Sequence, residues 1–376
     1  MSTHSPLAAG EDVATYVANR IGFIELDRPK ALNALSTAMI RAMHAALDRW
    51  RDDPEVLAIV VRSANPRAFC AGGDIRFLYD AQQRGERDAL DTFFIEEYRL
   101  NHAIFTYPKP YIALMNGIVM GGGMGISQGA YRTGGLRVVT ASTRMAMPET
   151  RIGLFPDVGV GWFLARTPGA IGRYLAVTGE SLGPADALYA GLADAYLEDE
   201  ALAALVDRLK TEAFERGADV VSCVAREAAA YRVVPTPDTS PIADARALID
   251  RHFALPDVAQ IIASLDAEGD CANADWAEQI GGVLRERSPL AMAVSLEVVT
   301  RAEGTMADCL RRDLDLTRST FERGDVSEGI RARIIDKDNR PNWRFARVED
   351  VPAEYVAGMF ESPWPANEHP LRDLVG

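Results

Sequence analysis

The chain has 376 residues, and at roughly 150 residues per domain this length predicts two domains, or one large domain with an extension. It carries 54 acidic against 40 basic side chains, and the resulting net charge of −14 disfavours binding to nucleic acid or to an anionic membrane. The contents of 48% hydrophobic and 25% charged residues are typical of a folded globular protein.

Cysteine usage and the N-terminus indicate the compartment. The cysteines form no CxxC pair and are too few for a disulfide scaffold, so we expect reduced thiols at Cys70, Cys223, Cys271 and Cys309. The first residues include Glu11 and Asp12 and lack the basic and apolar regions of a signal peptide. No apolar run approaches the roughly 20 residues that cross a bilayer. We therefore expect a cytoplasmic protein without membrane contact.

The first part of the chain predicts a strand, a helix and a second strand. Residues Ile21 to Leu26 alternate and are rich in Ile and Phe, which is typical of a strand. Ser36 is a suitable N-cap for a helix that ends near Asp52, because apolar residues then recur at helical spacing. The continuous apolar run Leu57 to Arg62 resembles a buried parallel strand.

The same alternation continues along the chain. Further strands are expected at Tyr111 to Met115 and at Leu136 to Thr140, and helices at about 160 to 216. The segment of about 205 to 285 is acidic, and its pattern predicts helices with a proline-rich break at Val234 to Pro237. Ser288 and Pro289 are suited to start a long helical region that ends near residue 333. This order of elements predicts an α/β fold with mostly parallel strands.

Two common classes of site lack their motifs. The five histidines never occur at metal-ligand spacing, so we expect no metal site. The sequence contains neither GK[ST] nor G-x-G-x-x-G, the usual signatures of ATP and dinucleotide sites. We therefore expect no cofactor.

The residues Gly125 to Gly129 match G-x-S-x-G, the nucleophile elbow of serine hydrolases. An elbow requires its strand to run directly into the first glycine. Here Gly121, Gly122 and Gly123 already end the apolar stretch, which places Ser127 inside a helix. An accidental match is the favoured interpretation.

Two glycine turns each follow a short apolar run and precede a helical one, at Ala71 to Asp74 and at Met120 to Gly123. Backbone N–H groups at such turns and at helix N-termini can bind the oxyanion of an acyl intermediate. The alternative is that these glycines only allow tight turns or close packing.

Carboxylates occur in two further patterns. Glu149 and Asp157 lie among small and apolar residues in a loop-like stretch, where a carboxyl can act as base, acid or nucleophile. Taken alone, Glu149 is more typical of a helix start or a salt bridge than of a catalytic group. The charge runs Glu96-Glu97 and 311–313 are expected on solvated helix faces.

Four stretches together resemble the enoyl-CoA hydratase/isomerase, or crotonase, superfamily: DRPKALNALS from Asp27, AFCAGGDIR from Ala68, NGIVMGGGMGIS from Asn116 and MPETRIGLFPDVG from Met147. The resemblance implies a crotonase-like (ClpP/crotonase) spiral fold of repeated ββα units with a helical C-terminal region. It also implies a crotonase-like core domain at 12–204. The sequence pattern predicts a helical C-terminal region at 205–345, and the prolines of the last part predict an irregular tail at 346–376.

The resemblance also implies chemistry on an acyl-CoA thioester. The family's two oxyanion-binding N–H groups map onto Gly73 and Gly122. Hydratases of the family use two glutamates, of which the second matches Glu149 while the first matches Gly125, so hydration lacks one of its two groups.

MPET, GLFPDVG and the EEY at 96–98 are similar to the branch of the superfamily that hydrolyses 3-hydroxyisobutyryl-CoA, a reaction of valine degradation. The functional residues of that branch fall on Glu97, Gly122, Glu149 and Asp157. We therefore expect a thioester hydrolase in which Glu149 is nucleophile or general base and Asp157 assists.

The resemblance assigns substrate contacts as well. They fall on Glu97, Ala71, Asp74 and Lys30, with Arg28 as a second candidate cation for CoA. The alternatives are an enoyl-CoA hydratase/isomerase of the same fold and a non-catalytic acyl-CoA-binding protein. The acyl group stays open between 3-hydroxyisobutyryl and 3-hydroxypropionyl, which differ by one methyl group. A homo-oligomer, for which a trimer is the family habit, is also expected.

Overall fold

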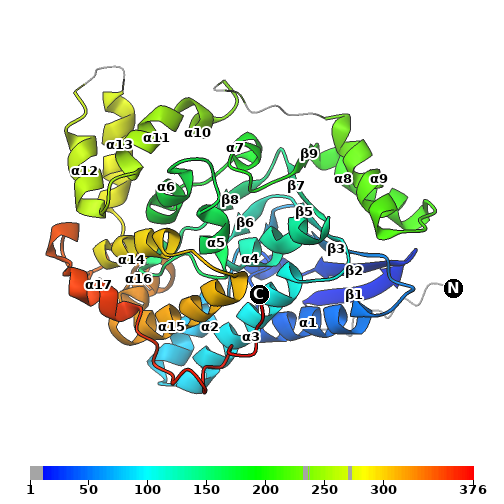
Figure 1. The fold of residues 1–376 in the computed structure, drawn as a ribbon, viewed down its shortest axis with the longest axis horizontal. Helices are drawn as coiled ribbons and strands as arrows, with labels where there is room; N and C mark the ends of the chain where they lie inside the picture. The colour runs from blue at the N-terminus through cyan, green and yellow to red at the C-terminus, as the bar shows by residue number, and fades with distance from the viewer. Residues whose placement is uncertain (1–11, 232–235, 237, 270–272) are drawn as a thin grey trace. The chain divides into compact units, whose positions relative to one another are not determined.

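A computed structural model describes residues 12–231, 236, 238–269 and 273–376 (Figure 1). Cys271, and Val234, Pro235 and Pro237 of the predicted break, lie outside the described residues, as does the stretch before residue 12. The chain forms two compact units. The first unit contains 1–73, 99–145 and 182–240, and the second contains 74–98, 146–181 and 241–376. Whether the expected segment 12–204 folds on its own stays a prediction.

The first unit is built on a six-stranded sheet with the strand order β1-β2-β3-β5-β7-β9. β1 pairs antiparallel with β2, and every later pair in this sheet is parallel. β3 and β5 are buried almost throughout, as expected for apolar runs inside a parallel sheet. The strands are β1 (Val13–Ala18), β2 (Ile21–Leu26), β3 (Ala58–Ser63), β5 (Tyr111–Met115), β7 (Leu136–Thr140) and β9 (Ala195–Leu197).

A second, three-stranded sheet has the order β4 (Ala68–Cys70), β6 (Ile118–Met120) and β8 (Arg144–Ala146). Each of its strands directly follows one strand of the larger sheet, and a helix follows in turn. This confirms the expected repeat of ββα units. The repeat places the two glycine turns at the ends of β4 and β6, which pair in parallel.

The helix α1 (Thr37–Arg51) begins where the sequence predicts, because the Ser36 side chain accepts a hydrogen bond from the N–H of Met39. Its apolar residues are buried, including Trp50. The same unit contains α4 (Gly122–Gln128), η2 (Gly129–Thr133), η1 (Pro29–Ala31), α7 (Pro184–Tyr189), α8 (Asp199–Thr211) and α9 (Gly217–Ala229). Leu205 and Leu209 of α8 and Val220 of α9 join a buried cluster with Phe23 and Val60 of the sheet.

The second unit is mainly helical (Figure 1). Ser288 caps α14, which confirms the predicted start, but the long helical region expected there is divided into α14, α15 and α16. Thr305 and Asp308 form a capping box at the start of α15. The tail was expected to be irregular, but it contains the short helix α17. Burial of the apolar side chains of Val356 and Met359 stabilises this helix. The helices are α2 (Ile75–Gln83), the first part of α3 (Arg87–Phe105), η3 (Glu149–Ile152), α5 (Val160–Leu164), α6 (Ile171–Thr178), α10 (Pro241–Asp244), α11 (Arg246–Phe253), α12 (Val258–Asp266), α13 (Ala274–Arg285), α14 (Pro289–Thr300), α15 (Met306–Arg323), α16 (Val326–Ile330), η4 (Arg331–Ile335), η5 (Val348–Asp350) and α17 (Ala353–Met359).

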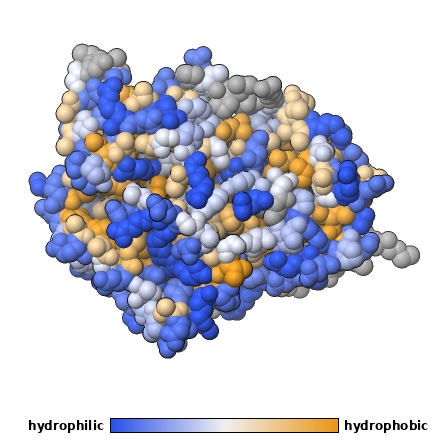
Figure 2. Space-filling view, in the orientation of Figure 1, coloured by the Kyte–Doolittle hydropathy of each residue, from blue (hydrophilic) through white to orange (hydrophobic). Residues whose placement is uncertain are grey.

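Polar and hydrophobic residues are interspersed on the face shown in Figure 2. Such mixing is ordinary, because apolar atoms contribute more than half of the surface of a folded protein. No helix among the described residues is both long and apolar enough to cross a membrane.

Two glycines provide a matched test of packing. A Cβ atom on Gly22 would lie 2.6 Å from Cε3 of Trp50, whereas one on Gly282 would have no atom within 4 Å. We expect Gly22→Ala to lower the free energy of unfolding by about 1–3 kcal/mol through overpacking. Gly282→Ala, on an exposed position of α13, should raise it by about 0.5–1 kcal/mol. Urea denaturation of both variants measures the two effects. Equal effects would contradict the close packing of Trp50 on β2.

Candidate active site

The two glycine turns of the first unit are in contact with each other. A Cβ atom on Gly72 would lie 3.4 Å from the carbonyl oxygen of Met120 and 3.7 Å from the nitrogen of Gly122. Gly72 also has a φ of +106°, which other residues rarely adopt. Glycine is therefore required here both for the backbone conformation and for the close approach of the turns.

The N–H groups of Gly73 and Gly122 are suited to bind an oxygen atom. α4 begins at Gly122, and N–H groups in a first helical turn have no acceptor within their helix. At the other turn Leu35 N–H donates to the carbonyl of Gly72 and Ala71 N–H donates to Leu32, while no acceptor for Gly73 N–H is recorded in the described part of the chain. The structure thus brings together the turns that carry these two donors.

Four buried carboxyl groups gather in the second unit. Glu97 lies on α3, Glu149 begins η3, Asp157 lies in the loop before α5, and Asp313 lies on α15. Their exposed fractions are 2%, 7%, 5% and 2%. Oε1 of Glu97 and Oε2 of Glu149 are buried and have no hydrogen-bond partner among the described residues. Buried polar atoms normally have partners, so these two oxygens indicate a place for a ligand.

Burial raises the pKa values of all four groups, and repulsion from neighbouring carboxylates raises those of Glu97, Glu149 and Asp313 further. Burial raises the pKa of Glu149 well above its usual range, and the charges of Asp157 and Glu97 add to this effect. Burial and the charge of Asp157 do the same to the pKa of Glu97. Burial raises the pKa of Asp157 to about 6. Carboxyl groups that titrate near neutral pH are suited to exchange protons during catalysis.

Asp313 is held by the loop that carries Asp157. Its Oδ2 accepts a hydrogen bond of 2.8 Å from Gly159 N–H, two residues after Asp157. Burial, together with the charge of Asp157, raises the pKa of Asp313 to about 8. Asp313 therefore positions the loop, and its raised pKa favours the neutral carboxyl near pH 7.

The raised pKa of Asp313 predicts a pH-dependent stability. Below about pH 4 the carboxyl is protonated in both the folded and the unfolded chain. Between there and pH 8 it ionises only in the unfolded chain, so stability is lost as the pH rises. Asn keeps an acceptor for Gly159 and does not ionise. We expect Asp313→Asn to raise the melting temperature at pH 8 and to change it little at pH 4.5, as measured by thermal denaturation. A greater gain at the lower pH would contradict the assignment.

The remaining predicted substrate residues are not part of the carboxyl cluster. Lys30 is exposed on η1, and Arg28 pairs with Asp12 at 3.2 Å. Ala71 lies in the first glycine turn. The Asp74 side chain caps α2 by accepting a bond from Phe77 N–H. Gly73 and Gly122 belong to the first unit, and Glu97, Glu149 and Asp157 to the second.

The serine-elbow alternative is not supported by the structure. Ser127 is fully buried inside α4, and its hydroxyl donates to the carbonyl of Met124. It therefore does not present a nucleophile at a turn, as the interpretation of an accidental match expects.

The prediction of solvated charge runs is wrong for two residues. Glu97 and Asp313 are each 2% exposed. Both lie on the apolar faces of their helices: Glu97 follows Phe93 and Phe94 at helical spacing, and Asp313 follows Leu310. The spacing could have revealed both carboxyl groups, because a charge within an apolar stripe is buried with it.

Tyr98 and Thr317 are site residues to which the sequence assigned no role. The Tyr98 hydroxyl donates to Oδ2 of Asp157 at 2.7 Å and lies 2.8 Å from Oγ1 of Thr317. Tyr98 follows Glu97 directly, and both are fully buried on α3. The signal available in the sequence was a tyrosine directly after a glutamate within the apolar stripe of a predicted helix.

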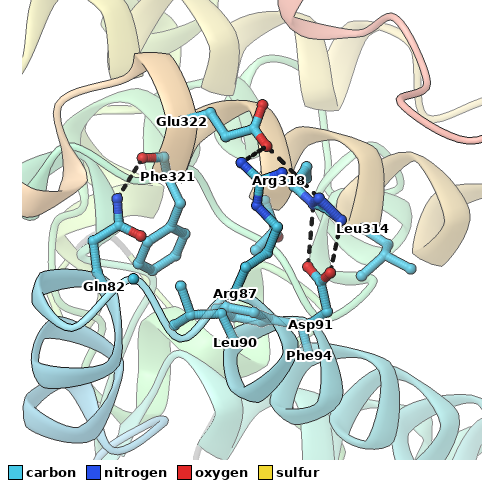
Figure 3. A pocket seen from close by; sticks show the side chains of 11 residues that line it. Gln82, Arg87, Leu90, Asp91, Phe94, Leu314, Arg318, Phe321 and Glu322 are labelled. Atoms are coloured by element: carbon cyan, nitrogen blue, oxygen red, sulfur yellow. Dashed lines mark hydrogen bonds and ion pairs between the residues drawn. The ribbon is translucent and has the colours of Figure 1, made fainter.

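A pocket of about 490 Å³ lies between α3 and α15 of the second unit. Figure 3 shows the side chains that line it. Arg318 pairs with Asp91 at 2.7 Å, Arg87 pairs with Glu322 at 2.8 Å, and Gln82 donates to the carbonyl of Phe321. Its charged groups therefore satisfy one another. None of the four buried carboxyl groups lines it, although Thr317 does.

Metal-ligating side chains are not clustered in the described ranges: no group of three or more His, Cys, Asp or Glu there is arranged to hold a metal ion. Cys70, Cys223 and Cys309 are buried and form no disulfide bond within the described ranges.

Comparison with known proteins identifies the family. Residues 21–360 match the family model for enoyl-CoA hydratase/isomerase, and the chain belongs to that family. It is 37% identical over 364 residues to the mitochondrial 3-hydroxyisobutyryl-CoA hydrolase of Xenopus tropicalis, covering 96% of this chain and 91% of the relative. The human protein of the same name is 37% identical over 367 residues, with the same coverage of both chains.

Two solved structures of proteins with related names have folds similar to that of this chain. An enoyl-CoA hydratase from Rhodobacter sphaeroides is 36% identical with a TM-score of 0.82, covering 94% of this chain and 98% of that one. A carnitinyl-CoA dehydratase from Mycobacterium thermoresistibile is 35% identical with a TM-score of 0.86, covering 97% and 99%. The expected crotonase-like fold is thereby confirmed.

Proposed function

We propose that this protein is a thioester hydrolase that cleaves 3-hydroxyisobutyryl-CoA to 3-hydroxyisobutyrate and CoA, a step of valine degradation. The observation that carries the proposal is its similarity, over 96% of the chain, to proteins named as hydrolases of this thioester. The buried carboxyl cluster adds the chemical groups that hydrolysis needs: a nucleophile or base and a proton carrier.

In the proposed reaction, the N–H groups of Gly73 and Gly122 bind the thioester oxygen. Glu149 then either attacks the carbonyl carbon or removes a proton from an attacking water. Attack by Glu149 forms a mixed anhydride and releases the CoA thiolate, and water then hydrolyses the anhydride to the free acid and restores the glutamate. In the alternative, water adds directly and its second proton leaves with the product. Asp157 orients the water in both.

The raised pKa of Glu149 suits this role. A carboxyl whose pKa is raised by burial is a stronger base once ionised than an exposed one. When protonated, the same group can supply a proton to the departing thiolate, and it is proposed to do so in the general-base alternative. The unpaired oxygen of Glu149 can accept a hydrogen bond from water or contact the substrate, because no group of the described chain occupies it.

The substrate contacts are proposed on the same grounds of family resemblance. Glu97 is a substrate contact, and its unpaired Oε1 supports this assignment. Ala71 and Asp74 would contact CoA through the backbone of the glycine turn, with exposed Lys30 as the cation. We propose that no cofactor is needed, because CoA is part of the substrate.

One experiment separates the main alternatives. Thiol release from 3-hydroxyisobutyryl-CoA, followed with a thiol-reactive dye, should be fast for the wild-type protein and slower for 3-hydroxypropionyl-CoA. The two solved structures named as a hydratase and a dehydratase favour addition of water as the second candidate function. That function predicts loss of the conjugated absorbance of crotonyl-CoA without thiol release. However, α4 has no carboxylate, and Gly125 occupies the expected position of the first glutamate.

Binding of 3-hydroxyisobutyryl-CoA without either reaction would identify a non-catalytic acyl-CoA-binding protein. Calorimetric titration combined with the two assays distinguishes this case. Retention of the buried Glu149 and Asp157 favours catalysis.

The compartment and the assembly are further proposals. We propose cytoplasmic localisation from the reduced cysteines. The relatives are named mitochondrial, so fractionation of the native cells is the test. We also propose a homo-oligomer, a trimer or a multiple of one, which light scattering after size-exclusion chromatography measures.

A further inference from the structure

A continuous row of oxygen atoms runs from Asp157 into α15 of the second unit. Oδ2 of Asp157 lies 2.7 Å from the Tyr98 hydroxyl, which lies 2.8 Å from Oγ1 of Thr317. Oγ1 of Thr317 in turn lies 2.8 Å from the carbonyl oxygen of Asp313. Asp157, Tyr98 and Thr317 are all at least nine-tenths buried. Water therefore has little access to any contact in the row.

The number of hydrogen atoms available for hydrogen bonds in this row depends on whether the Asp157 carboxyl is protonated or ionised. Three contacts require three hydrogens, and the hydroxyls of Tyr98 and Thr317 supply one each. When Asp157 is protonated, it donates to Tyr98, Tyr98 donates to Thr317, and Thr317 donates to the Asp313 carbonyl. All three contacts are then hydrogen bonds.

When Asp157 is ionised, both hydroxyl hydrogens can turn toward it. Tyr98 donates to the carboxylate, and Thr317 donates to the oxygen of Tyr98. Only the contact between Thr317 and the Asp313 carbonyl then lacks a hydrogen. That carbonyl lies inside α15, where the helical N–H four residues later is its ordinary partner, so the loss is small.

We propose that Tyr98 and Thr317 are positioning residues which hold the Asp157 carboxyl in one place in both of its protonation states. Hydrogens reverse direction along the row while the oxygen atoms stay where they are. Asp157 can then take up and release a proton without moving its side chain. This inference rests on the proposed function for its role in hydrolysis, but not for the behaviour of Asp157 itself.

The other groups that face Asp157 are acidic. They are Glu97 and Tyr98 on α3, Glu149 on η3 and Asp313 on α15, and their interactions with Asp157 raise their own pKa values. Among the side chains around Asp157, Tyr98 lowers its pKa by donating to the ionised form. The Tyr98 hydroxyl, together with a backbone hydrogen bond to the carboxylate, therefore helps Asp157 to ionise in a buried acidic cluster.

The two positioning residues should shift the pKa of Asp157 in opposite directions. Tyr98→Phe removes the charge-assisted bond to the carboxylate and should raise this pKa by about 1–2 units. Thr317→Val leaves the Tyr98 hydroxyl without an acceptor when Asp157 is protonated. It disfavours the protonated form and should lower the pKa by about 0.5–1 unit.

Infrared titration of the full-length protein measures these shifts without substrate. The carboxylic C=O band of Asp157 is assigned by its absence in Asp157→Asn, and its intensity is followed against pH in each variant. Thr317→Ser should restore the wild-type titration. Thr320→Val is the matched control, because Thr320 also donates to a carbonyl one turn earlier on α15, that of Leu316. It should leave the titration unchanged.

The pH profile of kcat/KM is the second readout. Its acid limb should move to higher pH in Tyr98→Phe and to lower pH in Thr317→Val. Shifts of both variants in the same direction, or an equal shift in Thr320→Val, would overturn the proposal. If Tyr98→Phe does not fold, as judged by circular dichroism, the Thr317 variants carry the test alone. Opposite infrared shifts in a protein that releases no thiol would support the positioning role and count against the proposed function.

Discussion

Glu149→Gln should reduce thiol release from 3-hydroxyisobutyryl-CoA by about 100- to 10,000-fold while the protein stays folded. Gln has nearly the same shape as Glu but neither attacks a thioester nor accepts a proton from water. Because burial raises the pKa of Glu149, the neutral amide is also tolerated by the folded chain. Steady-state kinetics with the thiol-reactive dye measure the loss, and a thermal melt shows that the fold is retained.

A control variant tests whether the loss is specific. Glu180→Gln removes a carboxylate of the second unit that lies outside the buried cluster, 3.8 Å from Arg287. It should keep near-normal turnover. If Glu149→Gln also kept near-normal turnover, Glu149 would be neither nucleophile nor base, and the proposed mechanism would fail.

The same residue distinguishes the two mechanisms. A single turnover in ¹⁸O-labelled water places the label in the Glu149 carboxyl if a mixed anhydride forms and water attacks the glutamyl carbonyl. Direct attack of water on the thioester places the label only in the product, and so does attack of water on the acyl carbonyl of an anhydride, so label in Glu149 is the outcome that establishes the anhydride. Mass spectrometry of the peptide that contains Glu149 reads out the difference.

The fold was predictable where local patterns and burial coincide. Ile21–Leu26 and Tyr111–Met115 are strands as predicted, because short apolar runs next to turn residues have few other stable arrangements. β1 was not predicted. The four middle residues of Val13–Ala18 are half-buried in an edge strand, so no continuous apolar run reveals it.

The candidate site was predictable only in part. Its residue types follow from the resemblance, and the contact of the two glycine turns follows from the parallel strands before them. The surroundings of Asp157 depend on packing between segments far apart in the chain, since Tyr98 and Thr317 are 219 residues apart. The burial of Asp313, in contrast, could have been predicted from its position within the apolar stripe of α15.

Replacing the amide of Gly122 by an ester should lower kcat by about 100- to 1,000-fold, the usual cost of losing one oxyanion donor. The change exchanges a single N–H for oxygen, adds no side chain, and leaves the glycine conformation intact. It is made by incorporating glycolic acid at position 122. Thiol release and a thermal melt are measured on the purified protein.

The same exchange at Gly125 separates a lost oxyanion donor from a weakened helix. Gly125 N–H donates within α4, to the carbonyl of Gly121, whereas Gly122 N–H lies in the first turn. The ester at 125 therefore removes a helical hydrogen bond and should reduce stability more than the ester at 122, with turnover close to normal. Equal losses of kcat in both proteins would show that α4 affects turnover through its stability. A loss confined to 122 would assign the oxyanion to that N–H, because only there does the exchange remove a donor that the folded chain leaves free.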